Sequence, residues 1–282
     1  MARSKALNEY LANKHRGGEN NQKGGLYEDF YAVFQIVSCL AKYKHQLDDV
    51  SFQTQLEDTF VDDLLIAQPD VNVYHQLKNT QQVAWGKVEK IGDIAFDFAH
   101  QIEDCKERDE SFALKLIFSV QKTSVKEEIP ELIEGYSEAE WFPYQQDINQ
   151  LVLISSDLKK ALRSISAEGA DAQDDQLANI ATLFLGVWRG ANSKSRVSLS
   201  DLIKKAESEK RVNLAIYPDT VISKECKKIL DAIVGIEYHV SGRMFYWRFG
   251  FMKGECPWPD EMEQKIIDTR PRTKLDLIAL LG

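Results

Sequence analysis

The sequence predicts a mixed α/β (α+β) fold, in which helices flank one sheet and a mostly helical C-terminal part follows. In several long segments, apolar residues recur at spacings of three and four, as in amphipathic helices. Shorter segments alternate apolar and polar residues, which is typical of strands with one buried face. With 282 residues, 44% of them hydrophobic and 28% charged, the chain can form one large or two modest globular domains.

The N-terminal half begins with a glycine-rich segment and a long apolar helix. Residues 3–13 predict a short helix, and the four glycines within residues 15–25 predict a mobile loop. A strong helical pattern follows over residues 26–44. Its apolar stripe is wide, so this helix should be buried on most sides. The stripe consists of Leu26, Phe30, Val33, Phe34, Val37 and Leu40.

A change of period marks the start of the predicted sheet. Residues 50–58, 64–66 and 71–78 read as short strands, with a turn at Pro69-Asp70 before the last of them. Residues 86–107 return to a helical pattern with one apolar stripe, and residues 112–120 are apolar enough for a central strand. The pattern then predicts a strand over 150–156 and a helix over 157–165.

The second half of the chain is predicted to be a separate domain. Residues 166–175 are small and polar and form the best linker candidate, so the expected domains are 1–165 and 166–282. Helices are expected over 175–188, 198–210, 223–235 and 273–282, with a hairpin over 236–249. Aromatic residues crowd positions 245–258, as in a core or in a protein interface. This domain is expected to bind partners or to mediate oligomerisation.

Charge and composition restrict the classes of function. A formal net charge of −9 and a pI near 5.2 argue against a stand-alone DNA-binding protein, which usually has a basic face. No apolar run is long enough to span a bilayer, and the first residues lack an apolar signal region. We therefore expect a cytoplasmic protein with no membrane contact, whose four dispersed cysteines are reduced. No phosphate-binding G-x-x-x-x-G-K-[ST] motif occurs.

One constellation of polar residues has the pattern of a catalytic site. Gln76 and Lys78 occupy alternate positions of the strand at 71–78, so both point to one face. Asp63, at the entry of the strand at 64–66, can project to the same edge. Carboxylate and carbonyl oxygens bind Mg²⁺, and a neighbouring lysine can stabilise charge that develops on a phosphate. Simpler readings remain open: Asp63 and Lys78 as a surface ion pair, Gln76 as an outward polar residue, and Asp62 as a turn cap.

This stretch resembles the PD-(D/E)xK nuclease superfamily, in the variant where the second acid is glutamine (Q-x-K). More narrowly, it looks like the double-strand DNA endonuclease domain of bacterial anti-phage effectors, of the CBASS effector or Lamassu nuclease type. Gly24-Gly25 followed by Tyr27-Glu28, Trp85 after the Q-x-K strand, and the strand at 112–120 are similar to that subfamily. The resemblance covers roughly residues 20–165 and implies a restriction-endonuclease-like fold for that domain.

The resemblance also implies roles for individual residues. Asp63, Gln76 and Lys78 would be catalytic. The metal ion, Mg²⁺ or Mn²⁺, would be held by Glu28, Asp63, Gln76 and the backbone carbonyl of Leu77. Gln76 departs from the usual acid, because a neutral amide binds metal more weakly than a carboxylate. An alternative for Glu28 is a carboxylate in the first helical turn that faces the helix dipole.

Further residues are weaker candidates. Glu57 and Asp62 are possible additional ligands. Lys14, Arg16 and Lys23 in the glycine-rich segment and just before it are candidate DNA contacts, because this segment leads into the helix that carries Glu28.

Together, these features predict a metal-dependent endonuclease effector subunit of a Lamassu-like anti-phage complex. Its substrate would be double-stranded DNA. The resemblance implies two partners, an ATPase related to chromosome-maintenance (SMC) proteins and a small accessory subunit. Homo-oligomerisation on activation would bring together the two sites that a double-strand cut needs. The alternative is a catalytically inactive, nuclease-like adaptor or scaffold subunit.

Overall fold

A computed structural model describes most of the chain. The described residues are 7, 9–11, 13–14, 22–44, 46–121, 125, 127–191, 193–209, 214, 222–241, 244–259 and 261–281, without the side chains of 22–24. They fall into two compact units, residues 1–213 and 214–282. Within this part of the chain, no helix combines the length and apolar character that a membrane crossing requires.

A six-stranded mixed sheet organises the first unit. Its strands lie in the order β5-β4-β3-β2-β1-β6. The antiparallel pairs are β6 with β1, β1 with β2 and β2 with β3, whereas β3, β4 and β5 run parallel. The strands are β1 (Ser51–Thr54), β2 (Leu64–Ala67), β3 (Asn72–Lys78), β4 (Phe112–Phe118), β5 (Ser137–Trp141) and β6 (Val197–Ser198).

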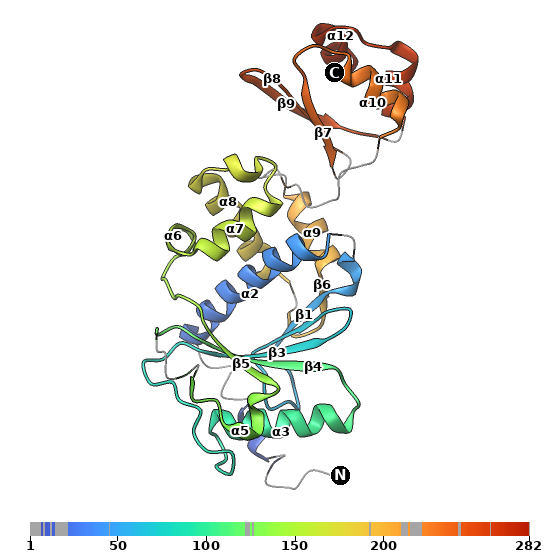
Figure 1. Ribbon diagram of the computed structural model, residues 1–282. Coiled ribbons are helices and arrows are strands. Elements are labelled where there is room, and N and C mark those ends of the chain that lie inside the picture. Colours follow the sequence, from blue (N-terminus) through green and yellow to red (C-terminus); the bar gives the residue numbers. More distant parts are fainter. Residues whose placement is uncertain are drawn as a thin grey trace. The chain divides into compact units, whose positions relative to one another are not determined.

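Helices cover both faces of this sheet (Figure 1). The long helix α2 (Gln22–Lys42) lies on one face and packs against helices α7 (Ser156–Ile165) and α8 (Asp174–Arg189). The same side holds α6 (Ile148–Ile154), α9 (Leu199–Ser208) and the short 3-10 helices η1 (Leu47–Asp49) and η2 (Gly169–Asp171). The opposite face carries α3 (Ile94–Glu107) and α5 (Glu131–Glu134).

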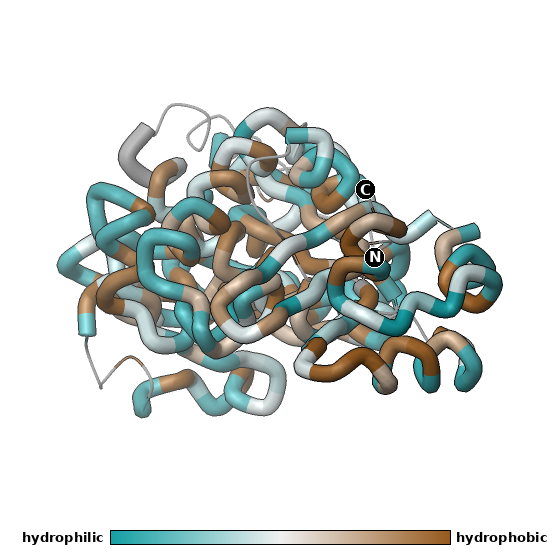
Figure 2. Tube along the Cα trace, turned by 90° about the horizontal axis from the view of Figure 1, so that it is seen from above, coloured by the Kyte–Doolittle hydropathy of each residue, from teal (hydrophilic) through white to brown (hydrophobic). Residues whose placement is uncertain are grey.

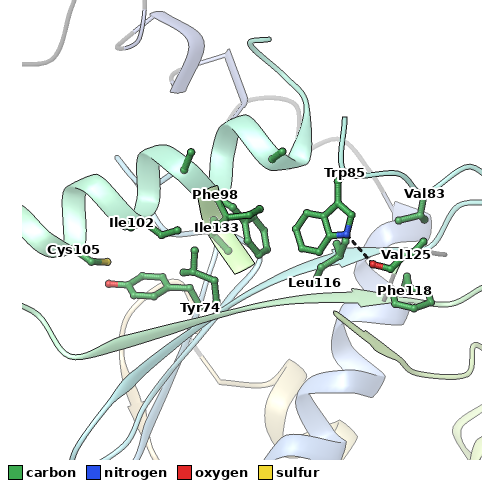
Figure 3. Close-up of a cluster of buried hydrophobic side chains, with 14 of the residues drawn as sticks. Tyr74, Val83, Trp85, Phe98, Ile102, Cys105, Leu116, Phe118, Val125 and Ile133 are labelled. Carbon is green, nitrogen blue, oxygen red and sulfur yellow. Dashed lines mark hydrogen bonds between the residues drawn. The ribbon is translucent and has the colours of Figure 1, made fainter. Parts of the chain in front are cut away.

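A hydrophobic cluster joins α3 and α5 to the sheet (Figure 3). Trp85 lies at its centre, with its ring 5.2 Å from that of Phe98 in an edge-to-face arrangement. The indole Nε1 of Trp85 donates a hydrogen bond of 2.8 Å to the carbonyl oxygen of Val125. Tyr74 of β3 and Leu116 of β4 belong to the same cluster. Because side chains alternate along a strand, this cluster identifies the face of β3 toward which Gln76 and Lys78 also point.

The opposite face of β3 is buried against α2. His75 is 1% exposed, and its ring lies 5.5 Å from that of Tyr31 in α2. Its Nδ1 is 3.2 Å from the carbonyl oxygen of Leu64. Burial lowers the pKa of His75 to about 3. His75 and Gln76 therefore face opposite sides of the sheet, as alternation along β3 requires, and His75 serves packing.

Capping residues and apolar faces account for several helices. Ser198 accepts a hydrogen bond of 3.0 Å from the backbone N–H of Asp201 at the start of α9, and Ser223 caps α10 (Lys224–Asp231) in the same way. Hydrophobic and hydrophilic stretches are interspersed along the coloured trace (Figure 2). In α9 the buried residues recur at spacings of three and four, which gives the helix one apolar face; they are Leu199, Leu202, Ile203 and Ala206. Both caps agree with the helix starts predicted from the sequence.

Several predicted boundaries were wrong. Residues 150–156 are not a strand, because they belong largely to α6, whose cap Asp147 accepts a hydrogen bond from the backbone N–H of Asn149. The helix expected from residue 86 begins at Ile94, since Gly86 and Gly92 have positive φ angles of 72° and 93°. Helix α2 begins at Gln22, so residues 22–25 are helical instead of a loop. The edge strand β5 was missed, because its sequence is polar.

The predicted domain boundary after residue 165 was also wrong. Helix α8 packs against α2 and α6, and β6 pairs with β1 of the central sheet. Residues 166–213 therefore complete the first unit, and the segment proposed as a linker, 166–175, connects two packed helices. The first unit is larger than expected because α8 packs on α2 and β6 adds a strand to the sheet beside β1.

The second unit combines helices with a three-stranded antiparallel sheet, so "mostly helical" was an incomplete description. Strands β7 (Glu237–Ser241), β8 (Met244–Phe249) and β9 (Met252–Pro257) lie in that order. Helices α10, α11 (Met262–Thr269) and α12 (Lys274–Leu281) accompany them. Phe245 and Trp258 are buried and stacked at 5.2 Å, whereas Phe251 in the β8–β9 turn is fully exposed. The predicted hairpin is confirmed, and the crowded aromatics are only partly core.

Two tryptophans provide a matched test of the packing around Trp85. Trp141 also donates its indole N–H to a carbonyl, that of Ser119 at 3.0 Å, but it is 41% exposed. We expect Trp85→Phe to lower the free energy of unfolding by about 2 kcal/mol, because the carbonyl of Val125 loses its partner in a dry environment. Trp141→Phe should change it by less than about 0.5 kcal/mol, since water can replace the indole. Urea denaturation of both variants measures the difference, and equal losses would contradict this account of the core.

Candidate functional site

The candidate site lies where β3 continues past the start of β2. Leu64, the first residue of β2, pairs with His75, so Gln76, Leu77 and Lys78 extend beyond the paired segment. On the other side these residues remain paired with β4. The edge of β3 that faces β2 is therefore left without a strand partner at this end of the pairing.

Asp63 supplies the missing partner. Its Oδ2 accepts a hydrogen bond of 2.7 Å from the backbone N–H of Leu77 and another from Nε2 of Gln76. The β2–β3 register, extended by one residue, sets Asp63 opposite Gln76, which explains why their side chains share a face. The sequence-based prediction that Asp63 and Gln76 converge is confirmed.

The backbone of β3 directs a further oxygen to this edge. The carbonyl of Lys78 accepts from the backbone N–H of Ser119, on the β4 side. Because successive residues of a strand point their carbonyls to opposite sides, the carbonyl of Leu77 faces the β2 side, where Asp63 lies. The side chain of Lys78, two residues after Gln76, points to the same face as the Gln76 side chain.

The loop before β2 is held by α3. Gln101, fully buried in α3, accepts hydrogen bonds from the backbone N–H groups of Phe60 at 2.9 Å and Val61 at 3.2 Å. The carbonyl of Asp62 accepts from the backbone N–H of Leu56 at 3.1 Å. These contacts fix the backbone on both sides of Asp62 and so orient Asp63.

Glu28 contributes a carboxylate from α2. It lies in the second turn of that helix, so the alternative of a first-turn carboxylate facing the helix dipole does not apply. Burial raises the pKa of Glu28 to about 8, and the negative charges of Asp63 and Asp29 add to this effect, while Lys78 opposes it. Glu28 therefore retains its proton at neutral pH, and nearby positive charge would release it.

Lys14 occupies the other side of Gln76. Its ammonium lies 2.8 Å from Asp97 Oδ2, 3.2 Å from Asp62 Oδ1 and 3.3 Å from Gln76 Oε1, and it also donates to the carbonyl of Phe60. Burial lowers the pKa of Lys14, but the charges of Asp62 and Asp97 outweigh it, so the pKa is raised and the ammonium stays charged. Burial raises the pKa of Asp62 to about 6, and Lys14 limits that rise.

This position corrects the prediction that Lys14 is a DNA contact. The Lys14 side chain is only 17% exposed, and its donors are already used, so it does not offer its charge to a phosphate backbone. Arg16 and the side chain of Lys23 lie outside the described residues. Glu57 is exposed in the turn after β1, not on a strand next to the site.

Asp97 was missed by the sequence analysis. It lies on α3 among apolar residues and is only 5% exposed. Its other oxygen accepts a hydrogen bond of 2.8 Å from the hydroxyl of Tyr10. An acidic residue in a buried helical stripe was the available signal, because a buried charge needs a partner elsewhere in the chain.

The residues present are compatible with one divalent cation. Four carboxylates, Glu28, Asp62, Asp63 and Asp97, face two ammonium groups, Lys14 and Lys78, so the site has an excess of negative charge when all are ionised. Hard oxygen donors of this kind suit Mg²⁺ or Mn²⁺. Within the described part of the chain, no three histidine, cysteine, aspartate or glutamate residues form a metal-binding group by themselves. A cation would therefore rely on Gln76 and the Leu77 carbonyl beside Asp63 and Glu28.

Comparison of the chain with models of protein families, with curated proteins and with solved structures finds no significant match.

The raised pKa of Glu28 leads to a testable pH dependence. Because the folded protein holds this proton up to about pH 8, while the usual pKa is 4.5, the free energy of unfolding should fall as the pH rises between these values. Glu28→Gln has no carboxyl group to titrate, so its free energy of unfolding should not fall in this way. Without metal, it should exceed that of the wild-type protein by about 1–2 kcal/mol at pH 8, after allowance for solvent screening.

Urea denaturation between pH 5 and pH 9 provides the measurement, with the exposed Glu103→Gln on α3 as control. The difference between Glu28→Gln and the wild-type protein should grow with pH, while the control should show no such trend. A pH-independent difference for Glu28→Gln would show that Glu28 titrates normally.

Proposed function

We propose that this chain is a metal-dependent DNA endonuclease, the effector subunit of a Lamassu-like bacterial anti-phage complex. One observation carries the proposal: Asp63 and Gln76 meet on one face at the unpaired edge of β3, and Lys78 follows on the same face. The helix, three-strand meander, helix and parallel strand of residues 22–118 also agree with the element order on which the resemblance to PD-(D/E)xK nucleases was based. A restriction-endonuclease-like identity of the fold is part of the proposal.

The chemistry would depend on Mg²⁺ or Mn²⁺. When bound, the cation polarises the scissile phosphate and lowers the pKa of a coordinated water. Asp63, Glu28, Gln76 Oε1 and the carbonyl of Leu77 would hold it. The ammonium of Lys78 would stabilise the negative charge that grows on the phosphate and orient the attacking water. Glu28 would lose its proton as the cation enters, because the positive charge lowers its pKa.

The acidic character of the chain bears on its setting. With a net charge of −9, the chain gains little from long-range attraction to DNA. We therefore propose that it acts in a cytoplasmic complex, in which an SMC-like ATPase and a small accessory subunit bind double-stranded DNA and activate cleavage. Homo-oligomerisation on activation would pair two sites for a double-strand cut.

Cleavage of plasmid DNA tests the site assignment. The full chain would be incubated with supercoiled and linear DNA and Mg²⁺ or Mn²⁺, alone and with its partners. We expect Asp63→Asn and Lys78→Met each to reduce the cleavage rate by at least about 100-fold, because the first weakens the binding of the cation and the second removes the charge that stabilises the reacting phosphate.

Two exposed residues provide matched controls. Asp70→Asn, in the turn before β3, and Lys90→Met, 69% exposed beside Asp93, should leave the rate unchanged. Cleavage that survives both site substitutions would reject the assignment. Intact DNA in every sample, the wild-type complex included, would favour the alternative of an inactive nuclease-like adaptor.

A further inference from the structure

We propose that Lys14 is a positioning residue that holds the amide of Gln76 turned away from a metal-binding orientation. The inference rests on the proposed metal site and concerns its regulation. Gln76 is 2% exposed and lies between two charges of opposite sign, the ammonium of Lys14 and the carboxylate of Asp63. Its orientation therefore decides which of its two polar atoms faces Asp63.

Electrostatics allows only one favourable orientation of this amide. The carbonyl oxygen Oε1 accepts from Lys14 at 3.3 Å, and the Nε2 group donates to Asp63. The reverse orientation would direct NH₂ at an ammonium and a carbonyl at a carboxylate, and both contacts would be repulsive. While Lys14 is docked, Gln76 therefore presents donor hydrogens toward Asp63, where a cation requires an oxygen.

Lys14 is held in place by contacts independent of Gln76. The ammonium of Lys14 lies 2.8 Å from a carboxylate oxygen of Asp97 and 3.2 Å from one of Asp62. It also donates to the carbonyl oxygen of Phe60. Asp62 Oδ1 is buried, and within the part of the chain that the structure describes it accepts no hydrogen bond of good geometry, so the ammonium of Lys14 is its main electrostatic partner there. Lys14 thus both neutralises two buried acids and occupies the carbonyl of Gln76.

The segment that carries Lys14 docks through a small apolar contact. Leu11 is buried with Phe60 and Phe96. Tyr10 packs edge-to-face on Phe96 at 6.0 Å and donates to Asp97. Among the described residues, this contact involves fewer buried side chains than the core cluster under α3. A partner that draws the segment with Leu11 and Lys14 away would free the Gln76 carbonyl to turn toward Asp63, and the site would gain a neutral oxygen ligand without a change in the sheet.

Mn²⁺ affinity of the full chain tests this role without reliance on DNA cleavage. The key variant is the pair Lys14→Met with Asp97→Asn, because it removes one buried charge of each sign and so leaves the net charge beside Gln76 unchanged. We expect this double variant to bind Mn²⁺ about tenfold more tightly than the wild-type protein in calorimetry and in electron paramagnetic resonance titrations, since the competing arrangement of Gln76 is removed. Urea denaturation confirms that the variant is folded.

A second background tests whether the effect acts through Gln76. In a Gln76→Leu protein, the same pair of substitutions should leave Mn²⁺ affinity unchanged, because there is no amide to turn. An equal gain in both backgrounds would overturn the positioning role and indicate a general electrostatic effect. An unchanged or lower affinity in the double variant with Gln76 present would also overturn it.

Failure of the inference and failure of the proposed function are distinguishable. If Asp63→Asn abolishes Mn²⁺ binding while the double variant has the same Mn²⁺ affinity as the wild-type protein, the metal site is supported and the role of Lys14 is rejected. If no protein in the series binds Mn²⁺ in a manner sensitive to Asp63, both the metal site and the role of Lys14 are rejected.

Discussion

The site depends on the carboxylate of Asp63, which accepts the hydrogen bonds that a neighbouring strand would otherwise accept from β3. Strand β3 is longer than its neighbour β2, and at the point where β2 has not yet begun, Asp63 accepts the backbone N–H of Leu77 and the side-chain amide of Gln76. This arrangement leaves one edge of a buried strand open to polar groups without exposing an unpaired N–H. Gln101 of α3, on the face toward which Gln76 points, holds the loop that precedes Asp63, so a helix packed on the sheet supports the carboxylate.

The sequence predicted the parts of this arrangement that follow from local pattern. The alternation in residues 71–78 indicated that Gln76 and Lys78 share a face, and the position of Asp63 before a strand indicated the same edge. It did not predict the environment of Lys14, because that depends on a contact between residues 83 positions apart in the chain, Lys14 and Asp97. A glycine-rich neighbourhood suggested an exposed, DNA-facing lysine, while tertiary contacts bury it.

The fold was predicted to a similar extent. Long periodic segments became helices, and the hairpin predicted over residues 236–249 was confirmed by the antiparallel pairing of β7 with β8. Short apolar runs were ambiguous, as 150–156 shows, and a polar edge strand such as β5 carries little pattern. The prediction of the domain boundary was wrong because β6 pairs with β1, which is far away in the sequence. A local sequence pattern does not indicate such a pairing.

In the proposed site, Asp63 is a ligand of one divalent cation at the open edge of β3. A crystal structure of the full chain in the presence of Mn²⁺, with an anomalous difference map at the manganese absorption edge, tests this directly. We expect a peak within coordination distance of an Asp63 carboxylate oxygen, accompanied by a Gln76 amide whose oxygen points to the peak. Well-ordered density for Asp63, Gln76 and Glu28 with no anomalous peak between them at millimolar Mn²⁺ would contradict it.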